Sequence, residues 1–455
     1  MSDLEKYITA GSVEKLISMS AIDDRIQYSR PGTAIFYYLH PNPESELRLR
    51  EHLRKHRPEV LILNRNFPVD VPLIVAREDQ WLNFQKDLCD TYFPLPRKTK
   101  IIAITGTNGK TTTADLVLQL STLCGLKAIS IGTLGVRGER GLIEDFGLTT
   151  PSFIQLRRIL FQHAQESDVV AMEASSHALE QSRVTGLTFY SGAWTNFTQD
   201  HLDYHKTMDA YFEAKKKIFN YLRTGGTVYL PSTQTDLANK IAKPKSCKVL
   251  AGLGEELKSS LPSFFKTKFN LDNLSLALAL VQEVNPDVVK VDTRNLLPTP
   301  GRFYIKEWDE RAAIVDFAHT PDALENLLSA VREIYPLHKI KVLFGCGGDR
   351  DRGKRPLMGL AVQKYADELI LTSDNPRTED PMQIINDIAK PLDPKKYKKI
   401  EDRPTALINE LNDLGAMEVL VVAGKGHEDY IIKGTTKHPY SDILTLDKFL
   451  QGRAP

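Results

Sequence analysis

The chain has 455 residues, of which 42% are hydrophobic and 26% are charged, and this is enough for roughly three ordinary domains with a core each. Lys and Arg total 59 against 58 acidic residues, so no strong field for nucleic acid or an anionic membrane is expected. No run approaches the ~18 apolar residues of a membrane span, so we expect no membrane insertion. The start of the chain lacks the pattern of a secretion signal and the four cysteines form no CxxC pair, so we expect thiols in the cytoplasm.

The first predicted domain covers residues 1–97 and mixes strand and helix patterns. Apolar strand patterns stand at 33–39, 59–64 and 71–76, and helical patterns stand at 46–56 and 80–93. The following segment, PLPRKTK, has the prolines and basic residues of a linker. We therefore predict a small N-terminal α/β domain.

Two larger α/β domains are predicted after the linker, at 98–298 and 299–455. Strand patterns that alternate with helical patterns stand at 101–105, 127–133, 168–174 and 189–196, and again at 312–318, 340–345, 367–372 and 417–424. Such alternation is typical of parallel sheets with helices on both faces. We predict a central domain of P-loop type and a C-terminal Rossmann-like domain.

The stretch TGTNGKTTT, residues 105–113, has the features of a phosphate-binding loop. Gly106 and Gly109 let the backbone turn tightly, so that its N–H groups and the following helix end can face an anion. Lys110 can then reach the β and γ phosphates, and Thr111 offers a hydroxyl to Mg²⁺. The full Walker pattern is not met, because Ile104 stands at its first glycine position. The position between a strand and a helix favours a phosphate site over a glycine turn with a surface lysine.

Three further residues are candidates for catalytic or metal-binding roles, and each is weighed against an ordinary structural role. Glu173 ends a predicted strand at the same edge as the phosphate loop, where a carboxylate suits Mg²⁺, although a solvated glutamate is the alternative. His201 lies in DHLDYH, where HxDxH fits no common zinc motif. Lys215, in EAKKKIF, belongs to a run that is ordinarily a solvated helix face.

Taken together, the motifs resemble the Mur ligase family, the ATP-dependent amino-acid ligases of peptidoglycan synthesis. The resemblance covers nearly the whole chain from about residue 100. The motifs that carry it are TGTNGKTTT, TTP (149–151), MEASSHAL, TNFTQDHLDYH, FNLDNLSLALAL, GRF, DFAHTPDALENLL, FGCGGDRDRGKRPLMG, DNPR and AGKGHEDY.

The resemblance implies an ATP site with two Mg²⁺ sites. Lys110, Glu173, His201 and Lys215 match catalytic positions, and Lys215 matches a lysine that the family carbamylates, which makes it a carboxylate-like metal ligand. The implied metal positions are Thr111, Glu173, His201 and Lys215. The implied ATP-binding positions are Gly106, Thr107, Asn108, Gly109, Lys110, Thr111, Thr112, Asn270, Arg302, Asp316 and His319.

The resemblance also implies the two other substrates, UDP-N-acetylmuramoyl-L-alanyl-D-glutamate and meso-2,6-diaminopimelate. The implied positions for the uridylyl substrate are Asp24, Arg25, Thr149, Thr150, Ser175, Gln181 and Arg183. Those for the amino acid are Arg350, Asp374, Asn375, Pro376, Arg377, Gly424 and Glu428. In DNPR, the Arg377 fork suits the distal carboxylate of diaminopimelate and Asp374 suits its ammonium. L-Lysine has no such carboxylate and would leave a buried arginine unpaired.

The expected reaction is ATP-dependent addition of diaminopimelate to the D-glutamate through an acyl phosphate, by a monomer. The first domain departs from the family pattern, because Asp23, Asp24 and Arg25 replace an expected D-S-R triplet and HPNPESE replaces a Gly/Asp/His-rich loop. Three alternatives stay open: the same reaction with L-lysine or another diamino acid, a folylpolyglutamate-synthase-like ligase, or a catalytically inactive nucleotide-binding scaffold.

Overall fold

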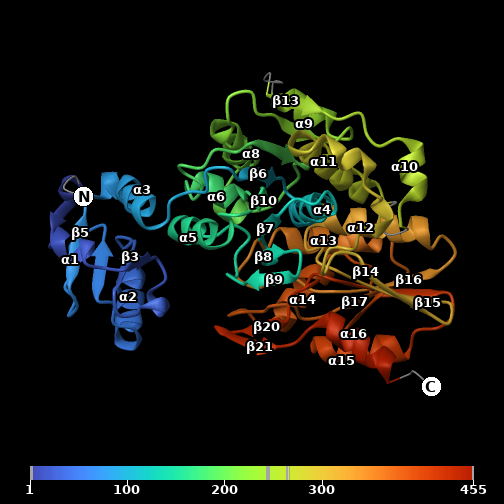
Figure 1. Cartoon of the computed structure of the whole chain (residues 1–455). Coiled ribbons are helices and arrows are strands. Elements are labelled where there is room, and N and C mark those ends of the chain that lie inside the picture. Colours follow the sequence, from blue (N-terminus) through green and yellow to red (C-terminus); the bar gives the residue numbers. More distant parts are fainter. Residues whose placement is uncertain (1–3, 242–245, 263–264, 266, 453–455) are drawn as a thin grey trace.

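A computed structural model describes residues 4–241, 246–262, 265 and 267–452, and its strands form three large sheets that follow one another along the chain (Figure 1). The sheets take their strands from 8–76, 100–249 and 304–423, and a separate hairpin follows the last of them. The predicted α/β class is confirmed. None of the described helices combines the length and apolarity needed to cross a membrane.

The N-terminal sheet has the strand order β1-β5-β4-β3-β2, and only β1 runs antiparallel to its neighbour. Its strands are β1 (Ile8–Ala10), β2 (Ala21–Asp23), β3 (Thr33–Tyr37), β4 (Val60–Leu63) and β5 (Leu73–Ala76), and its helices are α1 (Val13–Ile17), α2 (Pro43–Lys55) and α3 (Trp81–Tyr92). Helix α2 packs its apolar stripe on one face, while α1 and α3 cover the other. Each face of the sheet is therefore buried under helices.

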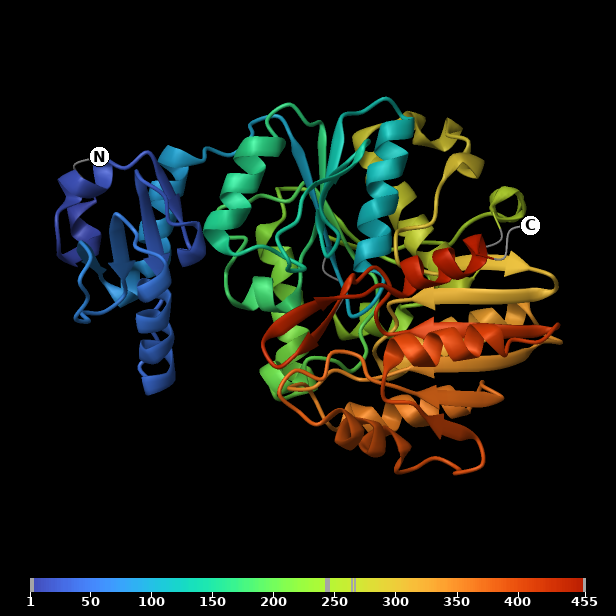
Figure 2. The ribbon, with the colours of Figure 1, turned by 90° about the horizontal axis from the view of Figure 1, so that it is seen from below.

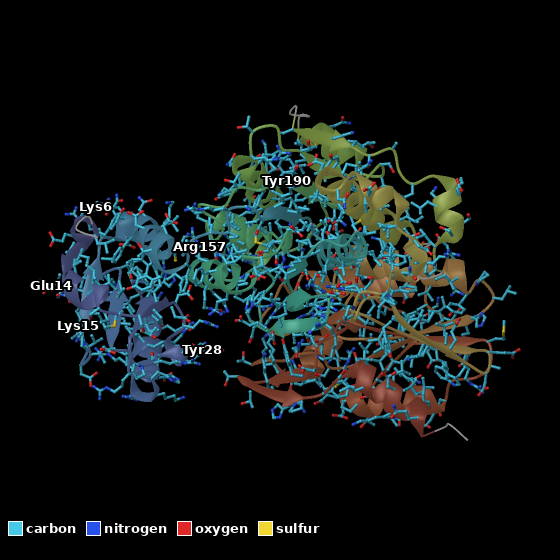
Figure 3. All side chains as sticks on the ribbon, in the orientation of Figure 1. Lys6, Glu14, Lys15, Tyr28, Arg157 and Tyr190 are labelled. Carbon is cyan, nitrogen blue, oxygen red and sulfur yellow. The ribbon has the colours of Figure 1, made fainter. Side chains whose placement is uncertain are left out.

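Helix α5 (Phe153–His163) of the central block holds the N-terminal block in place. Its residues Phe153 and Ile154 belong to the core cluster of the N-terminal block. Arg157, which Figure 3 labels at this junction, is fully buried and donates from Nη2 to an Asp90 carboxylate oxygen at 2.5 Å and to the Phe93 carbonyl at 3.2 Å. A buried guanidinium needs such partners. The two hydrogen bonds therefore hold α3 and the residue after it against α5.

The central sheet has eight strands in the order β13-β12-β11-β6-β10-β7-β8-β9. Its strands are β6 (Lys100–Thr105), β7 (Ala128–Gly132), β8 (Gly135–Gly138), β9 (Gly141–Glu144), β10 (Val169–Glu173), β11 (Ser191–Trp194), β12 (Val228–Leu230) and β13 (Cys247–Val249). Besides α5, its helices are α4 (Lys110–Leu123), α6 (Ser176–Glu180), α7 (Leu202–His205), α8 (Met208–Lys216), α9 (Thr235–Lys240), α10 (Glu255–Ser260) and α11 (Lys268–Val284). Helices α4 and α11 cover one face, and α5 and α8 the other.

The register of the central sheet brings three strand ends together. Glu173, the last residue of β10, pairs with Ile104 of β6, and Trp194, the last residue of β11, pairs with Thr105. Strand β6 leads directly into the glycine turn at 106–109. In a parallel sheet the carboxyl ends share one edge, which is where such folds hold ligands.

The C-terminal sheet has the order β14-β15-β19-β16-β17-β18, with β14 as an antiparallel edge strand. Its strands are β14 (Tyr304–Trp308), β15 (Arg311–Asp316), β16 (Lys339–Phe344), β17 (Glu368–Leu371), β18 (Tyr397–Lys399) and β19 (Glu418–Ala423), and the hairpin is β20 (Tyr430–Lys433) with β21 (Thr436–Pro439). The helices are α12 (Pro321–Ile334), α13 (Lys354–Gln363), α14 (Pro381–Ala389), α15 (Arg403–Asn412) and α16 (Asp442–Gln451). Helices α12 to α14 cover one face, and α15 and α16 the other.

The C-terminal block packs against the central block, while the N-terminal block extends to one side (Figures 1 and 2). The segment that joins the central and C-terminal blocks is held at Thr299, whose hydroxyl donates to the buried Asp115 carboxylate of α4 at 2.9 Å. Asp115 also pairs with Arg137 of β8. The joining segment is thus tied to the helix that follows the phosphate loop.

Candidate active site

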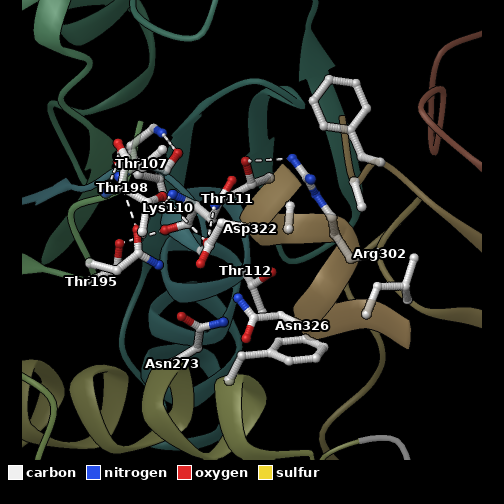
Figure 4. A pocket seen from close by; sticks show the side chains of 18 of the residues that line it. Thr107, Lys110, Thr111, Thr112, Thr195, Thr198, Asn273, Arg302, Asp322 and Asn326 are labelled. Carbon is white, nitrogen blue, oxygen red and sulfur yellow. Dashed lines mark hydrogen bonds between the residues drawn. The ribbon is translucent and has the colours of Figure 1, made fainter. Parts of the chain in front are cut away.

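A cavity of about 410 Å³ lies between the central and C-terminal blocks. Its central wall is the turn 107–112 with the ends of β10 and β11 and the start of α11, and its other wall comes from 302–303, 316–319 and the start of α12. Figure 4 shows side chains from both walls turned toward one another, with Arg302 reaching Thr111. Two different sheets therefore contribute to a single site.

The glycine turn is shaped by Asn196, which follows β11. The Asn196 side-chain oxygen accepts from the backbone N–H of Thr107 at 3.1 Å and of Asn108 at 2.9 Å. The Thr107 hydroxyl also bonds the backbone of Thr198. Two of the turn's amides thus already have a protein partner, so an anion would be met by the N–H groups at the start of α4.

Lys110 and Lys215 both turn their amines onto one backbone carbonyl, that of Gly106. The Nζ–O distances are 3.0 Å for Lys110 and 2.7 Å for Lys215, and Lys110 also donates to the Thr107 carbonyl at 2.8 Å. Burial lowers the pKa of Lys215 well below its usual value, and the charge of Lys110 lowers it further. Burial likewise lowers the pKa of Lys110. Lys215 is 1% exposed and does not lie on a solvated helix face.

Glu173 and Thr111 form the oxygen-donor set of the site. The Glu173 carboxylate accepts from the Thr111 hydroxyl at 3.1 Å and from the Thr133 backbone N–H at 2.7 Å. Glu173 is buried, not solvated, and burial raises its pKa although Lys110 opposes this. A threonine hydroxyl beside a buried carboxylate is a donor set that fits Mg²⁺.

His201 lies beside Asp200, with 3.4 Å between Nε2 and the Asp200 carboxylate. Burial lowers the pKa of His201 even though Asp200 opposes the shift, so the ring is neutral near pH 7. Burial raises the pKa of Asp200, but His201 and Lys354 of α13 outweigh that effect and the net pKa is low. Lys354 Nζ is 3.9 Å from Asp200 and brings a C-terminal cation to the central block.

The side chains of HxDxH belong to no cluster of metal ligands in the described part of the chain, where no three or more His, Cys, Asp or Glu side chains are arranged to hold a metal ion. His205 bonds the Ser176 hydroxyl at 3.0 Å, and Asp203 lies in the first turn of the short helix α7. His201 and His205 both lie against the rings of His177 and Tyr211, but their polar partners differ, Asp200 for His201 and Ser176 for His205.

The remaining predicted nucleotide residues lie on the same cavity. Asn270, Arg302, Asp316 and His319 all line it. Arg302 donates to the Thr111 hydroxyl at 3.2 Å and lies 4.3 Å from the ring centre of Phe317. Asp316 accepts from the backbone N–H groups of Phe303 and Ala318, both at 2.7 Å. Burial lowers the pKa of His319 to about 4.

The predicted uridylyl-substrate residues of the central block form a connected chain that begins at Glu173. The Thr150 hydroxyl bonds the Glu173 carbonyl at 2.8 Å and the Ser175 hydroxyl at 3.1 Å. Arg183 donates to the Thr150 carbonyl at 2.8 Å and to the Gln181 side-chain oxygen. Thr149 reaches Thr133 at 3.2 Å.

Asp24 and Arg25 lie outside this chain, at the end of β2. Arg25 is engaged in a bidentate pair with Asp23, at 3.0 and 2.9 Å, and stacks on Tyr28. Burial raises the pKa of Asp24 to about 6, while the neighbouring Ser152 hydroxyl at the start of α5 partly offsets the shift. The junction between the two blocks therefore contains a carboxyl group whose pKa is raised by burial.

The predicted amino-acid residues form a second cluster, at the carboxyl ends of β16, β17 and β19. Arg377 donates to the Gly348 carbonyl at 2.8 Å, and its pKa is lowered by burial and by the charge of Arg350. Asn375 donates to Glu428 at 2.9 Å. Gly424 is required there, because a Cβ would lie 2.7 Å from an Asp374 carboxylate oxygen. Pro376 follows in the same turn, between Asn375 and Arg377.

Several residues of the site were not singled out from the sequence. Asn196, Thr198 and Asp200 lie within the motif TNFTQDHLDYH, of which only His201 was predicted to belong to the site. Asp322 of α12 bonds the Asn108 side chain at 2.9 Å across the cavity, and Asn273 lies against Gly109. A signal was present for Asn196, since it follows a predicted strand at the edge where ligands bind.

Comparison with known proteins shows which families and solved structures this chain is similar to. Residues 104–289 match the family model of the Mur ligase middle domain, and residues 301–426 match that of the Mur ligase, glutamate ligase domain. The UDP-N-acetylmuramoyl-L-alanyl-D-glutamate–2,6-diaminopimelate ligase of Aquifex aeolicus (strain VF5) is 38% identical over 420 residues, 86% of each chain. A solved structure of a ligase with that name is 28% identical, with a TM-score of 0.57 over 96% of this chain and 95% of that one. The MurF ligase of Thermotoga maritima, solved with ADP, shares the fold at 13% identity, with a TM-score of 0.63 over 96% of this chain and 99% of that one.

Proposed function

Because this chain belongs to the Mur ligase family, we propose that it is an ATP-dependent ligase that joins meso-2,6-diaminopimelate to the D-glutamate of UDP-N-acetylmuramoyl-L-alanyl-D-glutamate. Relatives at 34–38% identity over most of the chain carry the corresponding name. The observation that carries the proposal is the convergence of Lys110, Thr111 and Glu173 on one cavity edge, with the buried Lys215 bonded to the Gly106 carbonyl of the same turn. No feature of the described residues favours an inactive scaffold.

The cavity between the two blocks is the proposed ATP site. The start of α4 and Lys110 would hold the phosphates, while Asn270, Arg302, Asp316 and His319 would surround the nucleoside. Two Mg²⁺ ions would supply charge stabilisation to the transferred phosphoryl group. Thr111 and Glu173 would hold the first, because a hydroxyl and a carboxylate are suitable hard ligands.

Lys215 and His201 are the proposed holders of the second ion. An ammonium is no metal ligand, but a buried amine with a strongly lowered pKa is a nucleophile toward carbon dioxide. The carbamate formed would be an oxygen ligand and would carry a negative charge. That charge would also suit the neighbouring Lys110, which shares the Gly106 carbonyl. We therefore propose that Lys215 acts in its carbamylated form.

The reaction then proceeds in two steps. The γ-phosphoryl group passes to the terminal carboxylate of the dipeptide, which gives ADP and an acyl phosphate. The amine of the amino acid attacks the acyl carbon, phosphate leaves, and an amide forms with loss of a proton. Lys110 lowers the cost of bringing anionic phosphate to an anionic carboxylate. Contacts across the cavity, such as Asn108–Asp322 and Asp200–Lys354, would keep the two blocks closed around the acyl phosphate.

The acceptor is proposed to bind at the DNPR turn. The guanidinium groups of Arg377 and Arg350 repel each other, and a ligand carboxylate would relieve this repulsion. Asp374 and Glu428 provide negative charge nearby for an ammonium. A distal centre that carries both groups, as in diaminopimelate, meets both requirements, whereas L-lysine meets only the second.

The uridylyl substrate is proposed to lie along Thr149, Thr150, Ser175, Gln181 and Arg183, toward Asp24 and Arg25 of the N-terminal block. These groups lead from Glu173 to the junction with the N-terminal block.

Mass spectrometry of the product formed from ATP, the uridylyl dipeptide and diaminopimelate tests the proposed ligase activity. A mass gain of one diaminopimelate less one water is expected, and an unchanged nucleotide would overturn it.

A further inference from the structure

Lys425 is a fully buried lysine between two turns of the C-terminal block, and the reaction described above does not use it. It follows β19, and its side chain is 0% exposed. Its Nζ lies 2.9 Å from a Glu428 carboxylate oxygen, 3.4 Å from the Asn375 side-chain oxygen and 3.7 Å from an Asp374 carboxylate oxygen. A charged amine is retained at such depth only when paired.

The three partners come from both turns that form the proposed acceptor site. Asp374 and Asn375 belong to the turn after β17, and Glu428 belongs to the turn after β19. Asn375 connects the two turns. Its Nδ2 donates at 2.9 Å to the Glu428 oxygen that also accepts from Lys425, and its Oδ1 accepts from the Ile432 N–H at 2.8 Å. The Lys425 amine therefore joins two carboxylates that would otherwise repel each other.

The atoms that Lys425 engages leave one oxygen of each carboxylate for another partner. Lys425 meets Oδ1 of Asp374 and Oε2 of Glu428. The other Asp374 oxygen, Oδ2, is the atom that faces Gly424, where the absence of a Cβ leaves room. Asp374, Glu428 and Lys425 together hold two carboxylates and one ammonium, so one ligand ammonium would balance these three groups. Arg377 interacts with the charges of both carboxylates, and Arg403 with that of Asp374.

We propose that Lys425 is a positioning residue for the acceptor: it holds Asp374 and Glu428 at the spacing that receives the distal ammonium of the amino acid. The inference rests on the proposed function, because it assigns Lys425 to the acceptor site of that reaction. Lys425 itself touches no reacting atom. Its effect is confined to the distal ammonium and does not extend to the distal carboxylate, which the arginines would hold.

The test compares two acceptors in the full-length enzyme and its Lys425→Met and Lys425→Gln variants. Diaminopimelate has the distal ammonium, and 2-aminopimelate keeps the distal carboxylate but lacks that ammonium. With Lys425→Met, KM for diaminopimelate is expected to rise at least about tenfold, whereas KM for 2-aminopimelate changes less than about twofold. Lys425→Gln, which keeps a hydrogen-bond donor, gives a smaller rise and guards against misfolding of the first variant.

Lys437→Met is the matched control, because Lys437 is an exposed lysine that lies 3.9 Å from the ring centre of Tyr430 on the adjoining hairpin. It should leave both KM values unchanged, and KM for ATP should stay the same in all variants. Equal losses with both acceptors, or none with either, would overturn the role of Lys425 while native ligation stands. If the native enzyme ligates neither acceptor, the proposed function itself fails.

Discussion

Lys110 and Lys215 donate to the same oxygen, the carbonyl of Gly106, at 3.0 and 2.7 Å. Two buried amines that share one acceptor repel each other when both are charged. Burial lowers the pKa values of both. The pair therefore places Lys110, the proposed phosphate-binding residue, next to a buried amine whose pKa is lowered well below its usual value. This relationship links the phosphate loop to helix α8, and it accounts for a lysine that would otherwise be costly to bury.

Replacement of Lys215 by methionine is expected to lower the ligation rate at least about 100-fold, because the proposed second metal position would lose the carbamate oxygen proposed as its ligand. The rate of amide formation at saturating substrates measures this. Lys216→Met is the control in the same run of lysines, since Lys216 is 43% exposed and pairs only with Glu213 of its own helix among the described ion pairs. A Lys215 variant within about threefold of native would contradict the role.

Asn196→Ala should raise KM for ATP about tenfold, because the Asn108 N–H loses the side-chain oxygen that it donates to and the Thr107 N–H keeps only the backbone carbonyl of residue 196, at 3.2 Å. The acceptor KM should stay the same. The exposed Asn239 of α9 gives the matched control, Asn239→Ala. Steady-state kinetics with varied ATP concentration measure this KM. An unchanged KM for ATP would show that the loop keeps its shape without the Asn196 side chain.

Arg377→Lys should raise KM for diaminopimelate at least about tenfold and leave KM for ATP as it is. An ammonium cannot replace the planar fork that engages a carboxylate through two N–H groups. Arg352→Lys is the comparison, because Arg352 is 70% exposed and pairs with Glu379 near the same turn. Equal effects of the two substitutions would argue against a carboxylate at Arg377.

Asp24→Asn is expected to stabilise the protein at pH 7. The pKa of Asp24 is raised from 3.8 to about 6 by burial, so the native chain binds more protons than the unfolded chain between these values. The free energy of unfolding therefore falls as pH rises from about 4 to 6, by up to roughly 3 kcal/mol from this group. Thermal melting should show a gain for Asp24→Asn at pH 7 that disappears near pH 4. A gain that is the same at both pH values would mean that the charge of Asp24 is not responsible.

Much of the site could be predicted from the sequence, because its residues follow strands. Gly106, Glu173 and Asp374 each stand at the end of an apolar run. Parallel pairing brings Gly106 and Glu173 to one edge of the central sheet, while Asp374 lies at the corresponding edge of the C-terminal sheet. The family resemblance added Lys215, which composition alone would assign to a solvated surface. The proposed roles of these residues stay predictions until they are measured.

What the sequence could not predict is contact between residues far apart in the chain. Asn196 shapes the loop at 107–108, Asp322 reaches Asn108 from the other block, and Lys425 lies between two separate turns. None of these follows from local spacing, since each depends on how two sheets or two turns meet. A buried lysine such as Lys425 also has no periodicity signal that separates it from an exposed one.

The most direct measurement is ATP-dependent phosphate release in the presence of UDP-N-acetylmuramoyl-L-alanyl-D-glutamate, with meso-diaminopimelate or L-lysine supplied in parallel. Sustained release is expected with diaminopimelate and little or none with L-lysine, because only diaminopimelate offers a distal carboxylate to Arg377. Equal or faster release with L-lysine would contradict the assignment of the acceptor site, and no release with either amino acid would contradict the ligase itself.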